Sequence, residues 1–231
     1  GFSGIEAGGK FPKNSNELIP KLEKENLKLC SGWYGANLLK NTVKEEILIM
    51  KDQLDLFKEC NAPCMVVAEV SGSIQGEVKI PLSKRPILNM DEWKTFYNKI
   101  SEISKYMEDT GVPLAYHHHM GTVVQSQEDT ERLIDNTSDT VKLLIDTGHM
   151  MFAGGDFVKI AKDYSSRLHH VHCKDIRKDV LDMSLKNDLS FIDAFFAGAF
   201  TVPGDGCINY ENFLKILKNF NYKGWLVVEA E

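Results

Sequence analysis

The sequence predicts an α/β protein, specifically a TIM (β/α)8 barrel, from three observations. First, short apolar runs alternate along most of the 231 residues with stretches whose apolar side chains recur every three or four positions. Second, the apolar runs are nearly uninterrupted, which is typical of parallel strands buried on both faces. Third, several runs end in a carboxylate or an imidazole, and catalytic side chains of barrels lie at the carboxyl ends of the strands.

The first half of the chain contains four strand–helix pairs. We expect strands at residues 4–7, 27–33, 64–70 and 113–119. The helices that follow them are predicted at residues 15–25, 42–60, 91–109 and 126–136, with Ser15 as the N-cap of the first. The second helix is the clearest, because Val43, Ile47, Met50 and Leu54 are spaced to form one apolar face.

The second half continues the alternation but contains an insertion. Strands are expected at residues 142–146, 168–175 and 224–229, and helices at 156–164 and 209–220. Residues 178–208 break the pattern, with a helical piece near 190–196, so we interpret them as a loop insertion over one mouth. The prediction is therefore a single barrel domain spanning residues 1–231.

The number of strands bears on the completeness of the barrel. A closed barrel has eight strands in about 250 residues, whereas this chain has seven predicted strands in 231 residues. We therefore expect the first strand with its helix, and the last helix, to lie outside this sequence. An open doubly wound sheet is the alternative, which the lack of a G-x-G-x-x-G motif after the first strand disfavours.

Composition restricts the partners and the location. The net charge of −6 argues against a nucleic-acid partner held by phosphate contacts. No apolar run approaches the roughly 20 residues that cross a bilayer, so no membrane partner is expected. Five scattered cysteines fit reduced thiols in a cytoplasmic protein.

Three predicted strands end in groups that bind metal ions. Asp146, His172 and Glu229 each follow an apolar run, and burying an unpaired charge there would be costly without a cation. Carboxylate and imidazole ligands suit Mn²⁺, Co²⁺, Mg²⁺ or Zn²⁺. His117 is the candidate fourth ligand, because it shares strand parity with His119.

Several strand-end residues also have simpler interpretations, such as an exposed edge for Glu229 next to Glu231. Asp146 could cap a turn, His172 could be a hydrogen-bonded core histidine, and Lys174 could be a solvated charge or a partner of Asp175. The remaining histidines, which alternate away from this face or lack a matching context, are expected to be structural or to lie on the surface: His118, His169 and His170.

Several motifs together resemble a known family, the xylose isomerase-like barrel superfamily. They are Asp146-Thr147-Gly148-His149, His172-Cys173-Lys174-Asp175, Pro203-Gly204-Asp205-Gly206 and Val228-Glu229. Within it, residues 4–12, 70–76 and 116–122 are similar to the inosose dehydratase branch. The resemblance covers the whole chain, from the second strand of the family to its eighth.

The resemblance implies a lyase of inositol catabolism. It would dehydrate 2-keto-myo-inositol (scyllo-inosose), a cyclic polyol ketone, to a trihydroxycyclohexane-1,2-dione, with Mn²⁺ or Co²⁺ and with glutathione as a cofactor. The metal set of the superfamily is two Glu, one Asp and one His, of which Asp146, His172 and Glu229 match three. His117 stands where the first Glu is expected, so the fourth ligand stays open.

The implied reaction needs a base, an acid and groups that bind hydroxyls. Glu229 or His119 is the candidate base, and His149 or Lys174 the candidate acid. The candidate substrate-binding residues lie near the ends of the first three predicted strands: Glu6, Trp33 and Glu69.

Three other functions remain open at this point. An isomerase or epimerase of the same superfamily would share the enolisation step. An apurinic endonuclease would need additional metal ligands and a basic face. A non-catalytic carbohydrate-binding barrel would fit the replacement of the first Glu by His117. A homo-oligomer is possible for any of them.

Overall fold

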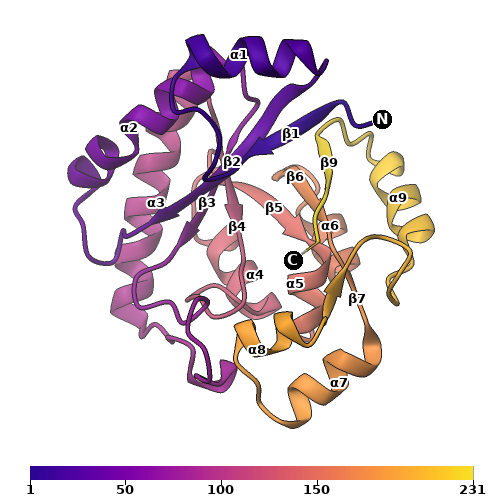
Figure 1. The fold of residues 1–231 in the computed structure, drawn as a ribbon. Helices are drawn as coiled ribbons and strands as arrows, with labels where there is room; N and C mark the ends of the chain where they lie inside the picture. The colour runs from indigo at the N-terminus through magenta and orange to yellow at the C-terminus, as the bar shows by residue number, and fades with distance from the viewer. Residues whose placement is uncertain (231) are drawn as a thin grey trace.

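The computed structural model describes residues 1–230, in which seven parallel strands form a nearly closed barrel with helices on its outside (Figure 1). The sheet order is β1-β2-β3-β4-β5-β6-β9. The strands are β1 (Gly4–Ala7), β2 (Lys28–Ala36), β3 (Met65–Glu69), β4 (Leu114–His117), β5 (Lys142–Asp146), β6 (Leu168–Cys173) and β9 (Trp225–Val228). The predicted α/β barrel is confirmed.

Most helices follow the predicted positions. They are α1 (Ser15–Lys24), α2 (Val43–Glu59), α3 (Met90–Thr110), α4 (Gln127–Asp135), α6 (Phe157–Asp163) and α9 (Tyr210–Asn219), with a short 3₁₀ turn at Leu82–Lys84. Ser15 was wrong as the first N-cap, because the side chain of Asn14 accepts the backbone N–H of Glu17 instead. Asparagine and serine cap helices about equally well, so sequence alone cannot separate adjacent candidates.

The buried apolar side chains form two layers of the barrel and a third cluster around the insertion at residues 178–208, which includes Phe191 and Phe200. The larger layer lies between the strands and the surrounding helices, and Phe96 and Ile100 of α3 are fully buried within it. The smaller layer fills the inside of the barrel and comprises Cys64, Val66, Ala115 and Leu144. Because strand side chains alternate, Ala115 and Leu144 of this inner layer share a strand face with the polar ends His117 and Asp146.

The barrel has an opening between its first and last strands. β1 and β9 lie at the two ends of the strand order and are not paired with each other in the described chain. A cavity of about 890 Å³ lies between them, lined by residues 1–6 and 225–229 among others. The ring of strands is thus complete except at this point.

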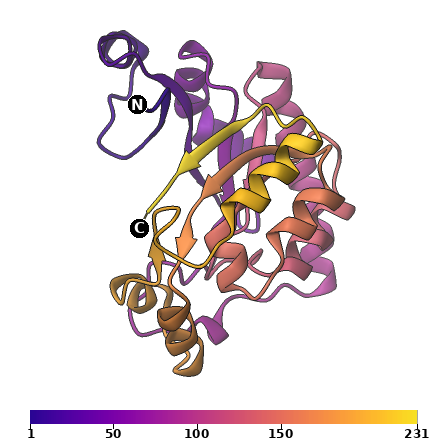
Figure 2. The same ribbon diagram turned by 90° about the vertical axis from the view of Figure 1, so that its right-hand side faces the viewer.

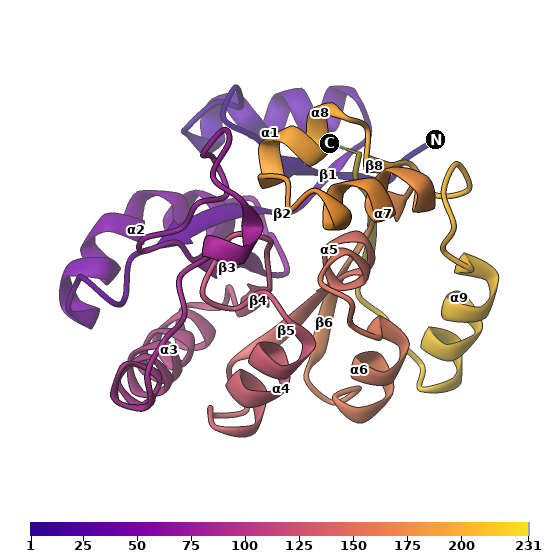
Figure 3. The same ribbon diagram turned by 90° about the horizontal axis from the view of Figure 1, so that it is seen from below.

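The insertion after β6 contains more structure than the sequence predicted. It holds α7 (Lys178–Lys186) and α8 (Phe191–Phe196), and a small antiparallel pair of β7 (Asp175–Ile176) and β8 (Phe200–Thr201). The expected strand at 168–175 is therefore split after Cys173. Figure 2 shows α7 and α8 together beyond the ends of β6 and β9, and Figure 3 shows them from below.

Asp175 ties the two ends of this insertion together. Its carboxylate accepts backbone N–H groups from Ile176, Gly204, Gly206 and Ile208, at 2.8–3.2 Å. A Cβ at Gly206 would lie 2.2 Å from an Asp175 oxygen, so a glycine is required there.

Across the described residues, no helix has the length and apolar character needed to cross a membrane.

Candidate metal centre and active site

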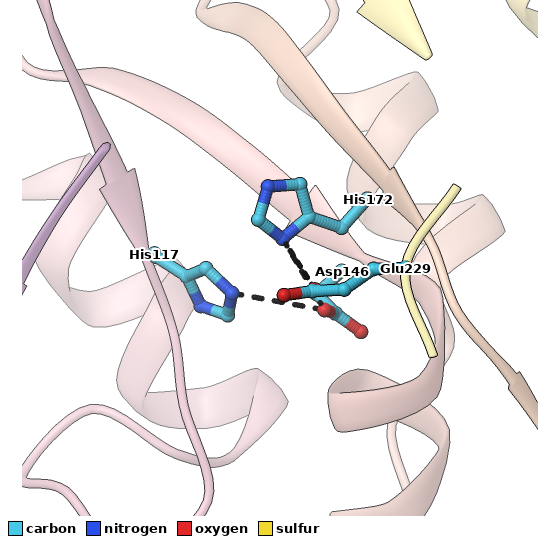
Figure 4. Close-up of side chains that lie close together, drawn as sticks. All are labelled: His117, Asp146, His172 and Glu229. Atoms are coloured by element: carbon cyan, nitrogen blue, oxygen red, sulfur yellow. Dashed lines mark ion pairs between the residues drawn. The ribbon is translucent and has the colours of Figure 1, made fainter. Parts of the chain in front are cut away.

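The structure brings the four predicted metal ligands together. His117, Asp146, His172 and Glu229 lie at or just past the ends of β4, β5, β6 and β9, and their side chains point toward one another (Figure 4). One ligand atom from each lies within 4.8 Å of the others. Oδ2 of Asp146 is 3.6 Å from Nε2 of His117 and from Nδ1 of His172, which in turn is 2.9 Å from Oε2 of Glu229.

The chemistry of these atoms fits a bound cation. Oδ2 of Asp146, Nδ1 of His172 and Oε2 of Glu229 are buried and make no hydrogen bond within residues 1–230. Ion-pair contacts with one another and with Lys174 compensate these atoms only in part, because buried polar atoms are normally also hydrogen-bonded. Two imidazole nitrogens and two carboxylate oxygens are a donor set that Mn²⁺, Co²⁺ or Zn²⁺ accepts.

His117 presents the correct nitrogen to this cluster. Its Nδ1 lies within hydrogen-bond distance of the carbonyl oxygen of His118, which can only accept, so Nδ1 carries the proton. The lone pair of Nε2 then faces Asp146. The structure therefore places a lone pair of His117 where a fourth ligand atom is needed.

Asp146 has two roles that the sequence presented as alternatives. Its Oδ1 accepts the N–H of His149 and caps helix α5 (Thr147–Phe152), while Oδ2 faces the other ligands. The predicted turn is thus the start of a helix. A Cβ at Gly148 would lie 2.9 Å from the backbone and side chain of Lys174, so only glycine lets this helix pack against β6.

Lys174 is a buried cation beside the cluster. Its Nζ lies 3.1 Å from Oε2 of Glu229, 3.5 Å from Oδ2 of Asp146 and 3.1 Å from Nε2 of His149. It also lies 5.4 Å from the ring centre of Phe200. His172 and Lys174 line one pocket, as predicted for a shared face, although β6 ends at Cys173 and Lys174 lies just past it.

That pocket opens beside the cluster and has a volume of about 310 Å³, near the lower limit for small-molecule sites. The predicted residues Glu6, Trp33, His119 and Lys174 line it, with three of the ligands. Trp33 meets His117 and His119 edge-on, with ring centres 5.5 and 5.4 Å apart. Sequence reasoning missed three further lining residues, Val66, Gln75 and Phe191.

The ligands favour their charged forms in the metal-free protein. Burial opposes the charge of Glu229, but Lys174 and His172 lower its pKa to about 2. Burial likewise opposes ionisation of Asp146, yet Lys174 and His149 hold its pKa well below the usual range. Burial disfavours protonated His172, but the nearby carboxylates raise its pKa well above 6.5. A cation would therefore displace a proton from His172.

The structure decides between the two expectations for His118 and His170, and it does not place Glu69 at the pocket. His118 and His170 are fully buried rather than on the surface; Nε2 of His118 accepts the N–H of Asp146, and Nε2 of His170 lies 2.8 Å from Glu6. Glu69 does not line the pocket; its two oxygens accept the N–H groups of Leu38 and Ser71, which fixes two loops. The parity shared by His170 and His172 was the signal for an inward side chain.

The metal-free protein should lose stability as the pH falls from 7 to 5. His118, His119 and His149 are buried, and burial lowers the pKa of each below 6.5, to about 3 for His118. The unfolded chain binds protons at these histidines below about pH 6.5 and the folded chain does not. The stabilisation from these histidines is therefore fully present above about pH 6.5. As the pH decreases further, the free energy of unfolding falls by about 1.4 kcal/mol per pH unit for each histidine.

Urea unfolding at pH 7, 6 and 5 in the presence of a chelator measures this loss. His172, whose raised pKa acts in the opposite sense, changes stability only above about pH 6.5. His118→Gln retains an acceptor for the N–H of Asp146 and should reduce the slope by one histidine. An unchanged slope in this variant would contradict the assignment.

The fold and the site together define a structural class. It comprises parallel barrels with acidic and imidazole side chains at the strand ends. The family model described as "Xylose isomerase-like TIM barrel" matches residues 1–231, and the chain belongs to this family. Among curated relatives, inosose dehydratase 2 of Bacillus cereus is 42% identical over 233 residues, covering 100% of this chain and 78% of that protein. The predicted similarity to that branch is confirmed.

Two further comparisons agree with this assignment. The rhizopine catabolism protein MocC of Rhizobium meliloti is 42% identical over 231 residues, covering 100% of this chain and 71% of that protein. A crystal structure described as the IOLI protein with a binding zinc atom matches with a TM-score of 0.64 at 17% identity, covering 98% of this chain and 78% of that one. The latter likeness concerns the fold.

Proposed function

We propose that the protein is a metal-dependent hydro-lyase that converts 2-keto-myo-inositol to a trihydroxycyclohexane-1,2-dione. The dehydratase class and the substrate are supported by relatives named inosose dehydratase that are 42% and 41% identical over the whole chain. The metal is supported by the convergence of one ligand atom from each of four side chains, all within 4.8 Å of one another. That convergence is the observation that carries the proposal.

His117, Asp146, His172 and Glu229 would hold the cation, for which we propose Mn²⁺ or Co²⁺. A divalent cation bound there supplies Lewis acidity to the ketone oxygen of the substrate. The residues around it must still move two protons. One leaves the carbon beside the ketone, and another is delivered to the departing hydroxyl.

His119 is the better placed of the two candidate bases. It lines the pocket, and its Nδ1 lies 2.8 Å from the carbonyl oxygen of Met120, so Nδ1 donates and Nε2 keeps its lone pair. Burial lowers the pKa of His119 well below 6.5, so the ring is neutral at pH 7. Glu229, the other candidate, directs Oε2 toward the ligand cluster instead.

Lys174 is the better placed of the two candidate acids. Its side chain lines the pocket, whereas His149 lies behind it and does not. We therefore assign Lys174 to the departing hydroxyl and His149 to the support of Lys174, 3.1 Å away. Trp33 forms a wall against which the face of the substrate ring packs.

The resemblance and composition supply the remaining details of the proposal. We propose glutathione as a cofactor, a cytoplasmic location and assembly as a homo-oligomer. We also propose that the partner is a small cyclic polyol ketone rather than a nucleic acid or a membrane. Each stays a prediction.

The direct test is incubation of the Mn²⁺-loaded or Co²⁺-loaded protein with scyllo-inosose. We expect loss of water and formation of the dione. The absorbance of the dione and mass spectrometry detect the product. An isomeric ketose of unchanged mass would instead identify an epimerase. Tight binding without turnover would identify a non-catalytic barrel, and removal of the metal by a chelator serves as the control.

A further inference from the structure

Glu6 is a carboxylate that contacts the proposed metal centre from behind. Its Oε1 lies 3.2 Å from Nε2 of His172 and 2.8 Å from Nε2 of His170. The other ring nitrogen of His172, Nδ1, faces Asp146 and Glu229. The two nitrogens of one imidazole therefore have different carboxylate neighbours, on opposite sides of the ring.

We propose that Glu6 is a positioning residue for His172, whose Nε2–H it accepts so that the lone pair of Nδ1 faces the cation. An ionised carboxylate can only accept, so the nitrogen that it contacts carries the single proton of the neutral ring. A carboxylate behind a ligating histidine fixes the tautomer and the ring orientation and increases the basicity of the ligand. The inference rests on the metal centre proposed above.

A second buried histidine holds Glu6 in this position. Nε2 of His170 donates to the same oxygen of Glu6, which leaves Nδ1 of His170 as an acceptor. Sγ of Cys64 lies 3.6 Å from that Nδ1, and burial raises the pKa of the Cys64 thiol to about 12, so the thiol is present to donate. Cys64 and His170 are both fully buried. The result is one chain of hydrogen bonds from Cys64 to His172.

The contacts also show why Glu6 stays ionised. Burial opposes its charge, but hydrogen bonds from His170 and His172 hold its pKa below the usual range. With its Oε1 engaged by two imidazoles, Glu6 is better suited to orient His172 than to bind a substrate hydroxyl. Glu6, His170 and His172 could alternatively hold a second cation, since their ligand atoms lie within 4.8 Å of one another. That arrangement would require His172 to lose both ring protons.

Titration with Mn²⁺ alone tests the proposal in the wild-type protein and in Glu6→Gln and Glu6→Ala. We expect one ion per chain in the wild type. In Glu6→Ala the affinity should fall by about 10- to 100-fold, the range for residues that support a metal ligand. Glu6→Gln should lose less, because its amide oxygen still accepts one N–H.

Imidazole ¹⁵N spectra give a second readout that general destabilisation would not move. His172 should carry its proton on Nε2 in the Mn-free wild type at high pH, and should show a mixture of tautomers in Glu6→Ala. Glu69→Gln is the matched control, because Glu69 is a carboxylate at a strand end whose oxygens accept the N–H groups of Leu38 and Ser71 and bond to no proposed metal ligand in the contacts described. Its Mn²⁺ affinity should equal that of the wild type.

The outcomes separate the inference from the metal centre itself. Unchanged affinity and an unchanged tautomer in Glu6→Ala would overturn the role of Glu6 and leave the centre intact. Two ions per wild-type chain, one of them lost in His170→Ala, would overturn it in favour of a second metal site. A wild-type protein that binds no Mn²⁺ would refute both.

Discussion

Asp146→Asn should abolish dehydration of inosose and reduce the affinity for Mn²⁺ by more than about 100-fold. This limit is the largest loss found for residues that only support a ligand, whereas Asp146 supplies a ligand atom to the cluster. The change removes the negative charge and places an NH₂ group where the cation would bind. Calorimetric titration and turnover measure the two effects.

The isosteric variant separates metal binding from folding. The new asparagine side chain would still accept the N–H of His149 through its Oδ1, so the cap of α5 is kept. Asp146→Ala loses both functions and should cost about 1 kcal/mol more in the free energy of unfolding of the metal-free protein. Wild-type Mn²⁺ affinity in Asp146→Asn would exclude the four-residue centre.

Lys174→Met should reduce kcat by about 10²- to 10⁴-fold, the usual contribution of a general acid. The substitution keeps the length and the buried apolar stem but removes the ammonium group that lies 3.1 Å from Glu229 and 3.5 Å from Asp146. Those carboxylates are then available to the cation without competition. We therefore expect Mn²⁺ affinity to be equal to or higher than that of the wild type.

The opposite directions of the two effects make this variant informative. A loss of both kcat and Mn²⁺ affinity would mean that Lys174 only maintains the shape of the site. Unchanged kcat would mean that His149, and not Lys174, is the general acid. Lys178→Met, on α7, is a matched control, because Lys178 pairs with Asp182 on the surface.

The sequence predicted the parts of the site that depend on strand parity and strand ends. Asp146, His172 and Glu229 could be assigned because each follows an apolar run, and parallel strands bring such ends to one side of the barrel. His117 was predicted from its parity with His119. The helices were found for a similar reason, because a repeat of three to four residues is visible over ten or more positions.

The parts that were missed depend on contacts between distant segments. Glu6 and His170 are 164 residues apart, and nothing local in either segment indicates their hydrogen bond. Helix α5 was not predicted, because its six residues are too few to show a period. The four backbone N–H groups that donate to Asp175 likewise come from residues near both ends of the long insertion.

The attachment of this insertion at Asp175 has an evolutionary consequence. The chain leaves the barrel at Ile176 and returns at Gly206 and Ile208 beside the same carboxylate, so its two ends meet regardless of what lies between them. Lengthening a segment with fixed ends costs little conformational entropy. The insertion is therefore an exchangeable module. A transplanted segment would alter the pocket wall that Phe191 contributes, while the proposed metal ligands of the barrel keep their places.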